Sequence, residues 1–248
     1  MPFTFSHPAI VFPLHALPKP WRSMTGLIAG SIVPDFEMFL KMKAETSFSH
    51  TLSGVFWFNL PLAFLLACLY HLLIRDVLIT HLPSFLRLRF NSFKNFNWIA
   101  YCRKNFLAVI LSVLVGACLH ILWDGFTHKN GLFVKLLPFL QTPVELASFT
   151  SPLYYLLQLG FSVLGAVVMV VSVFLLPVQH DQFPKKNKAT YWVMLVILAA
   201  PVFVIGMQQE FTSHYLSNVV VNAISALLIG LLLTSVYFRY ANKTTPVL

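Results

Sequence analysis

The chain has 248 residues, of which 58% are hydrophobic and 10% are charged, with 17 Lys and Arg against 8 Asp and Glu. A typical soluble domain has about 25% charged residues, so the mean hydropathy of +0.76 excludes an ordinary soluble protein and a disordered one. Most basic residues stand between apolar segments, where membrane topology explains the net charge of +9 and no nucleic-acid partner is implied. The composition predicts an integral membrane protein.

The N-terminal region lacks an uninterrupted apolar helix. Prolines divide residues 1–20, so we do not expect a cleaved signal peptide. The next apolar segment, 24–40, is short and contains Pro34, Asp35 and Glu37. Because non-helical backbone at membrane depth needs protein or water around it, we interpret 24–40 as a broken or re-entrant helix.

Five later segments approach the roughly 20 apolar residues that a spanning helix needs: 55–74, 105–123, 154–178, 190–207 and 218–238. No segment predicts a β-strand. The expected fold is therefore all-α: a polytopic membrane helix bundle with five spanning helices and an N-terminal broken or re-entrant helix. We expect residues 1–248 to form a single integral membrane domain.

The loops predict an orientation. Basic residues concentrate in loops 75–104 and 179–189 and in the C-terminal tail, whereas loops 124–153 and 208–217 have few or none. Because basic loops stay on the cytoplasmic side, the C-terminus is expected in the cytoplasm. Residues before about 54, and the two poorly basic loops, are then expected on the extracytoplasmic side.

One histidine and one acid on the second predicted span form the clearest candidate site. His120 and Asp124 stand at positions i and i+4 and share one helix face, which His128 extends if the helix continues past Gly125. Imidazole and carboxylate suit Zn²⁺ or a similar divalent ion. The alternative is structural, with Asp124 at the helix end and His120 hydrogen-bonded to a neighbour.

Three more residues are candidates on the same predicted side. Asp35 follows Pro34 inside an apolar run, although an acid in the first turn of a new helix is also favoured by the helix dipole. His50 is a lone interfacial histidine, a kind that is more often structural than a ligand, and His7 serves equally well as a structural residue. Together with His120 and Asp124, these side chains suffice for one metal ion, or for two bridged by a carboxylate.

Four sequence motifs carry a family resemblance: MPFTFSHPA at the N-terminus, then GSIVPDFE, SHTLSG and HILWDGFTHKNG. They resemble a family of uncharacterised bacterial membrane proteins with the MPFTFSHP signature. That family is similar to the YdjM-type membrane-bound metal-dependent hydrolases. More distantly, it resembles the superfamily of zinc-dependent phospholipase C and single-strand nucleases, whose soluble helical enzymes use an Asp, a His about fourteen residues later and an H-x-x-x-D pair.

The resemblance covers residues 1–131, the predicted metal-site half, and leaves 132–248 as a C-terminal helical half. Fourteen residues lie between Asp35 and His50, and the later pair is present. The resemblance implies a bacterial inner membrane and these metal ligands: His7, Asp35, His50, His120, Asp124 and, as a further candidate, His128. The later H-x-x-x-E pair of the soluble enzymes is missing after residue 131, where Glu210 and His214 occur in reverse order.

These features favour a membrane-embedded metal-dependent hydrolase. We expect it to act at the extracytoplasmic face on a phosphoester of a lipid or lipid-linked substrate. One or two divalent ions, with Zn²⁺ expected, would activate water, and Asp35 or Asp124 would bridge the ions or orient that water. Arg22, Lys41 and Lys43 could neutralise the phosphate, or could anchor the chain at the membrane interface.

Two other functional classes remain open. A non-enzymatic membrane protein, such as an assembly factor or a transporter, would use its polar residues only for helix packing. A metal-independent membrane phosphatase needs a cluster of basic residues and histidine on one side, and no arginine accompanies His120.

Overall fold

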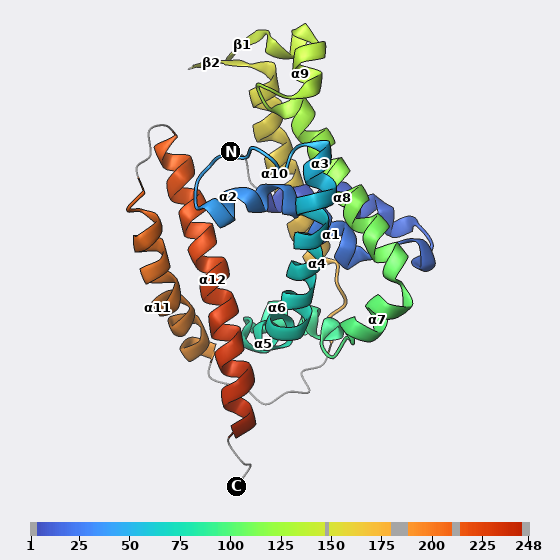
Figure 1. Ribbon diagram of the computed structural model, residues 1–248, viewed down its shortest axis with the longest axis vertical. Coiled ribbons are helices and arrows are strands. Elements are labelled where there is room, and N and C mark those ends of the chain that lie inside the picture. Colours follow the sequence, from blue (N-terminus) through green and yellow to red (C-terminus); the bar gives the residue numbers. More distant parts are fainter. Residues whose placement is uncertain (1–3, 147–148, 180–187, 210–213, 245–248) are drawn as a thin grey trace. The chain divides into compact units, whose positions relative to one another are not determined.

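The computed structural model describes residues 4–146, 149–179, 188–209 and 214–244, with backbone alone for 242–244 (Figure 1). The predicted all-α class is confirmed. The α-helices are α1 (Met24–Ile32), α2 (Phe36–Lys41), α3 (Leu52–Gly54), α4 (Leu60–Leu69), α5 (Arg75–His81), α6 (Ser84–Phe90), α7 (Trp98–Lys104), α8 (Phe106–Thr127), α9 (Leu132–Leu136), α10 (Leu153–Phe174), α11 (Lys188–Gly206) and α12 (Tyr215–Thr244).

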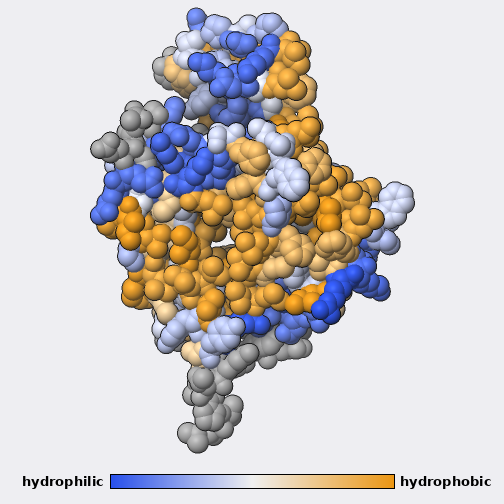
Figure 2. All heavy atoms as spheres, viewed as in Figure 1, coloured by the Kyte–Doolittle hydropathy of each residue, from blue (hydrophilic) through white to orange (hydrophobic). Residues whose placement is uncertain are grey.

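Five helical stretches of the described chain are long and apolar enough to cross a membrane: Leu52–His81, Phe106–Leu136, Leu153–Phe174, Lys188–Gly206 and Tyr215–Ala241. Each overlaps one predicted segment, so the five spanning helices are confirmed. Apolar side chains cover the middle of α11 and α12 in Figure 2. The second stretch extends beyond the predicted residue 123, because the helix continues past Gly125 and α9 follows after a short turn.

One short β-hairpin departs from the prediction that no segment is a strand. Strands β1 (Pro143–Leu146) and β2 (Phe149–Pro152) pair antiparallel, with Val144 opposite Ser151 and Leu146 opposite Phe149. Each strand has four residues, which is too short for an alternating pattern to stand out from the sequence.

The predicted break in segment 24–40 is confirmed. Helix α1 ends at Ile32, a 3₁₀ turn covers Val33–Asp35, and α2 begins at Phe36. Pro34 lies in this turn, where its missing N–H and its ring interrupt the α-helical hydrogen bonds. Upstream, the proline-rich region forms a 3₁₀ helix over Thr4–Ala16, followed by a second one over Lys19–Trp21.

The first spanning stretch contains two π-helical insertions. They cover Val55–Asn59, between α3 and α4, and Tyr70–Ile74, between α4 and α5. Such insertions are frequently found at functional sites. The first one places Asn59 in the interior, where its side-chain amide donates a 2.8 Å hydrogen bond to the Ser49 carbonyl.

The chain divides into two compact units. The first unit, called the site unit below, comprises Met1–Asp35, Ser47–Phe64 and Asn105–Ser172, and it contains every predicted metal ligand. The second comprises Phe36–Thr46, Leu65–Lys104 and Val173–Leu248. The expectation of a single membrane domain stays a prediction.

In the second unit, α11 packs against α12 and α2 is tied to the same helix. The Tyr191 hydroxyl lies 3.0 Å from Ser235 Oγ, which joins α11 to α12. Ser225 on α12 donates to the Phe39 carbonyl, and Asn222 donates to the Met42 carbonyl. Polar side chains inside the last span therefore serve helix packing.

Close packing of α1 on α8 forms the centre of the site unit (Figure 1). Gly26 and Gly30 of α1 face α8, and Gly116 of α8 faces α1. A methyl group added at Gly30 would lie 2.2 Å from the Val113 carbonyl oxygen. This G-x-x-x-G spacing lets two apolar helices approach to backbone contact, as in many membrane helix pairs.

We predict that Gly30→Ala destabilises the protein by about 1–3 kcal/mol, since the added methyl group would force the two backbones apart. The measurement is the thermal unfolding midpoint of detergent-purified protein. Gly160→Ala on α10 is the matched control, because a methyl group there meets no atom within 4 Å. Equal midpoints for the two variants would contradict the tight helix contact.

Candidate metal centre

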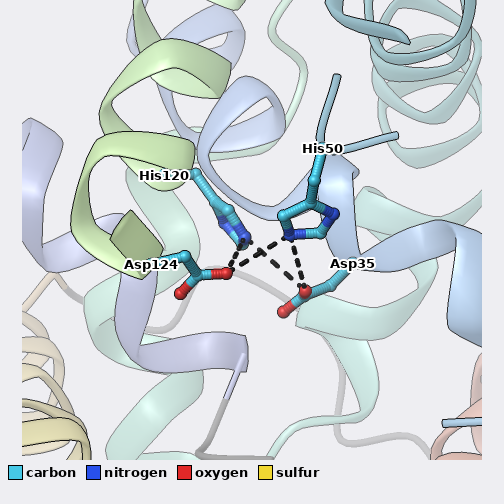
Figure 3. A group of neighbouring side chains, drawn as sticks. All are labelled: Asp35, His50, His120 and Asp124. Atoms are coloured by element: carbon cyan, nitrogen blue, oxygen red, sulfur yellow. Dashed lines mark hydrogen bonds and ion pairs between the residues drawn. The ribbon is translucent and has the colours of Figure 1, made fainter. Parts of the chain in front are cut away.

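The site unit brings its candidate ligands together from four places in the chain. His7 comes from the N-terminal 3₁₀ helix, Asp35 from the turn after α1, and His50 from the segment just before α3. His120 and Asp124 lie on the last turns of α8. Figure 3 shows the side chains of Asp35, His50, His120 and Asp124 pointing toward one another. The i,i+4 pair thus forms one wall of a shared site.

Four donor atoms from these residues lie within 4.8 Å of one another. Asp124 Oδ2 lies 3.3 Å from Nε2 of both His50 and His120, and Asp35 Oδ1 lies 3.8 and 3.5 Å from the same two nitrogens. In a tetrahedral zinc site with bonds of about 2.0–2.1 Å, neighbouring ligand atoms are separated by roughly 3.3–3.4 Å. The four His–Asp separations are therefore close to those in such a site, while all four donors lie within 4.8 Å of one another.

The outward-facing nitrogen of each histidine has its own partner. His120 Nδ1 donates a 2.7 Å hydrogen bond to the Ser31 carbonyl, and His7 Nδ1 donates to the Thr4 carbonyl at 3.1 Å. His50 Nδ1 lies 3.0 Å from the Ser49 hydroxyl. In a neutral ring, a proton used at Nδ1 leaves a lone pair at Nε2. This arrangement is the usual orientation of metal-binding histidines.

The Nε2 atom of His120 is a buried polar atom without a hydrogen bond in the described chain. His120 is completely buried, and its Nε2 lies near two carboxylates without being aligned on either as a hydrogen-bond donor. A buried polar atom in this state calls for an explanation. A cation bound between the imidazole and the carboxylates provides one.

Asp35 is a buried carboxylate with both oxygens in use. Its Oδ2 accepts a 2.6 Å hydrogen bond from the Thr4 hydroxyl, while Oδ1 faces His50 and His120. Burial is the largest single influence and raises the pKa of Asp35, but its interactions with His120 and His7 together outweigh burial and hold this pKa below its usual value. Asp35 is therefore ionised at neutral pH and available as a ligand or a base.

Asp124 is the residue shared by all four histidines. Its Oδ2 faces His50 and His120, and its Oδ1 lies 3.3 Å from both His7 Nε2 and His128 Nδ1. The ring of His7 also stacks on that of His120, with 4.0 Å between centroids. The structure thus gathers all six residues that the sequence singled out as metal ligands.

His128 differs from the other histidines in exposure and in its outer partner. Its side chain is 40% exposed, whereas that of His120 is not exposed at all. The Gln158 amide of α10 contacts His128 Nε2 at 2.8 Å, and the Thr127 hydroxyl lies 3.3 Å from Nδ1. His128 therefore stands at the open side of the site, oriented by α10.

The predicted phosphate-binding residues make other contacts. Arg22 Nε donates to the Leu17 carbonyl within the site unit. Lys41 and Lys43 belong to the second unit, where they pair with Glu37 and Glu45 respectively. A role for the three cations in binding phosphate stays a prediction. Glu210 lies outside the described residues, and His214 belongs to the second unit.

Sequence reasoning missed the residues that orient the ligands. These are Thr4, Ser31, Ser49 and Gln158. Ser31 acts through its backbone carbonyl, which carries no residue-specific signal. The G-x-x-x-G pattern at Gly26 and Gly30 is the one available clue, because it predicts a close helix contact next to this carbonyl.

A family model described as "Domain of unknown function (DUF4184)" matches residues 1–236 of the chain. No curated protein and no solved structure matches the chain. The likeness to the YdjM-type hydrolases and to the phospholipase C superfamily therefore stays a prediction that rests on the motifs.

We predict that the histidines of the site differ in chemical reactivity according to their exposure. In chelator-treated protein, diethyl pyrocarbonate should modify half-exposed His128 and exposed His15 quickly, and buried His120 much more slowly. Peptide mass spectrometry over a time course measures each rate. Modification of His120 as fast as that of His15 would show that α8 is not packed as described.

Proposed function

The chain belongs to the DUF4184 family, and from the geometry of its own site we propose that it is a membrane-embedded metal-dependent hydrolase. The proposed substrate is a phosphoester of a lipid or of a lipid-linked molecule at the extracytoplasmic face. One observation carries the proposal: Asp35, His50, His120 and Asp124 present four donor atoms to a common point, although they come from distant parts of the chain.

The donor set favours zinc. Two imidazole nitrogens with carboxylate oxygens suit Zn²⁺ and similar ions, whereas Mg²⁺ and Ca²⁺ prefer oxygen ligands throughout. One ion fits among the four converging donors. The other oxygen of Asp124 lies 3.3 Å from both His7 and His128, and Asp124 would bridge two ions if the site holds a second one.

The chemistry requires one position open to water, since catalytic zinc sites keep three protein ligands and a water. We assign the three ligands to His50, His120 and Asp124, whose donor atoms lie 3.3 Å apart in both His–Asp pairs. Asp35 lies farther from His50, at 3.8 Å, and the Thr4 hydroxyl fixes its other oxygen. Asp35 is then placed to accept a proton from the attacking water.

A bound ion supplies two kinds of assistance: it lowers the pKa of its water to about 7 and polarises the scissile group. The chain supplies the rest. Thr4 orients the Asp35 carboxylate, Ser31 fixes the His120 ring, and His128 stands at the more exposed edge, where substrate enters.

The position of the site along the chain supports a lipid substrate. His50 precedes the spanning stretch Leu52–His81 by two positions, and Asp124 and His128 stand at the end of α8. His50 thus lies next to the end of one candidate span, and Asp124 and His128 lie toward the same end of another, which continues to Leu136, so the site is near one end of both stretches. The basic loops favour the extracytoplasmic side for this end and the cytoplasm for the C-terminus, in a bacterial inner membrane.

The first test of the proposal is metal content. Detergent-purified wild-type protein should carry roughly one or two zinc ions per chain, as catalytic zinc sites do, and His120→Ala with Asp124→Ala should carry none. Inductively coupled plasma mass spectrometry gives the stoichiometry. His15→Ala is the matched control, since His15 is exposed on the same 3₁₀ helix as His7. Wild-type protein that binds no added zinc, manganese or iron would favour the non-enzymatic alternative.

The second test separates the base from the ligands. Asp35→Asn should keep bound metal while losing about 10²–10⁴-fold in turnover, the usual contribution of a general base. The assay is a screen of phosphodiesters, phosphomonoesters and lipid-linked pyrophosphates. Glu45→Gln, which changes an exposed acid of the second unit, is the control. Unchanged turnover in Asp35→Asn would remove Asp35 from the proposed mechanism.

A further inference from the structure

The segment that follows the site has an unusual surface for a loop. It runs from α9 through a 3₁₀ helix at Pro138–Gln141 to the β-hairpin, and we call it the α9–hairpin segment. Large apolar side chains stand exposed along it, from 43% to 64% of their full area: Leu132, Leu136, Phe139, Leu146 and Phe149. So much apolar surface in one short segment marks an interaction site.

The hairpin itself has a more apolar face, which carries its large apolar side chains, and a more polar face. Residues directly opposite in an antiparallel pair share a face, and alternate positions along a strand change face. Val144, Leu146 and Phe149 therefore share one face with Ser151, whereas Glu145 and Thr150 share the other face with Pro143 and Pro152. A two-stranded hairpin of this length is at best marginally stable alone in water, so its apolar face needs a partner.

One side of the α9–hairpin segment packs against the rest of the site unit. Val134 and Leu140 are buried, and the Phe133 ring stacks on Phe126 of α8 with 4.0 Å between centroids. Gly131, just before α9, approaches the backbone of Asp124 and Gly125 so closely that a methyl group would not fit. The exposed apolar side chains are thus left over after α9 has packed against α8.

The spanning stretches before and after the segment indicate what its exposed apolar side chains contact. The spanning stretch Phe106–Leu136 ends at the last residue of α9, and the next one begins at Leu153, directly after β2. Residues 137–152 therefore connect the ends of two candidate spans, and α9 is the last part of the first of them. The exposed cation Lys129 precedes the segment and the exposed cation Lys135 lies in α9, while its acid, Glu145, is on the more polar face of the hairpin. Apolar side chains with flanking lysines are typical of elements that lie in a membrane interface.

We propose that the α9–hairpin segment is a membrane-contacting cap whose partner is the interfacial layer of a bilayer with anionic lipids. Its apolar face, with Leu136, Leu146 and Phe149, dips into the lipid, and Lys135 meets the head groups. The cap is joined to the turn that carries Asp124 and His128, so it holds the open side of the site at the lipid surface. This inference does not depend on bound metal or on hydrolytic activity.

The test places a photoreactive benzoyl-phenylalanine at position 149 or at position 150 of the full chain, in vesicles of phosphatidylethanolamine and phosphatidylglycerol. After irradiation, mass spectrometry of intact protein should show a lipid adduct at position 149 and a far smaller yield at position 150 on the polar face. The two positions are adjacent, so local expression or folding defects affect both. A cross-link to a second copy or to another protein, or equal lipid yields, would overturn the proposal.

A second measurement uses a different probe. A nitroxide attached to Phe149→Cys or Thr150→Cys, in a chain with Cys68, Cys102 and Cys118 replaced by Ser, reports oxygen and nickel-chelate collision rates. We expect the label at position 149 to favour oxygen, as lipid-embedded labels do, and the label at position 150 to favour the chelate. A label at position 149 that is open to the chelate, or shielded from both reagents, would contradict lipid contact.

Discussion

The backbone contact between α1 and α8 is the constraint on which the site depends. Gly26, Gly30 and Gly116 remove the side chains that would separate the two helices. With the helices this close, the last turn of α1 places the Ser31 carbonyl 2.7 Å from His120 Nδ1. These three glycines carry no reactive side chain, but the close contact that they allow orients the His120 ring. Its Nδ1 binds the Ser31 carbonyl, and its Nε2 therefore faces the candidate metal site.

Charge balance is the second constraint. Two carboxylates, Asp35 and Asp124, are largely buried in one small volume, where like charges repel strongly. Four histidines surround Asp124, and a buried threonine hydroxyl binds Asp35. An apolar protein retains such a group of charges only when partners compensate them, and either protonated imidazoles or a bound cation can do so.

Much of this arrangement could be predicted from the sequence, because composition and helical spacing act locally. The five spans, the break at Pro34 and the shared face of His120 and Asp124 all follow from patterns within about 20 residues. The partners of the ligands could not be predicted. The contact between Thr4 and Asp35 joins residues 31 positions apart, and that between Gln158 and His128 joins residues 30 apart. The β-hairpin was missed because its strands are too short to show a pattern.

The N-terminal 3₁₀ helix has a consequence for how the protein is made. It supplies His7 and Thr4, which are synthesised well over a hundred residues before Asp124. Thr4 can meet Asp35 as soon as the turn after α1 has been made, whereas His7 lacks Asp124 and His120 until α8 has been made. The candidate metal site is therefore completed late in synthesis. A bound metal ion would show that the whole site unit has assembled, and not only one of its helices.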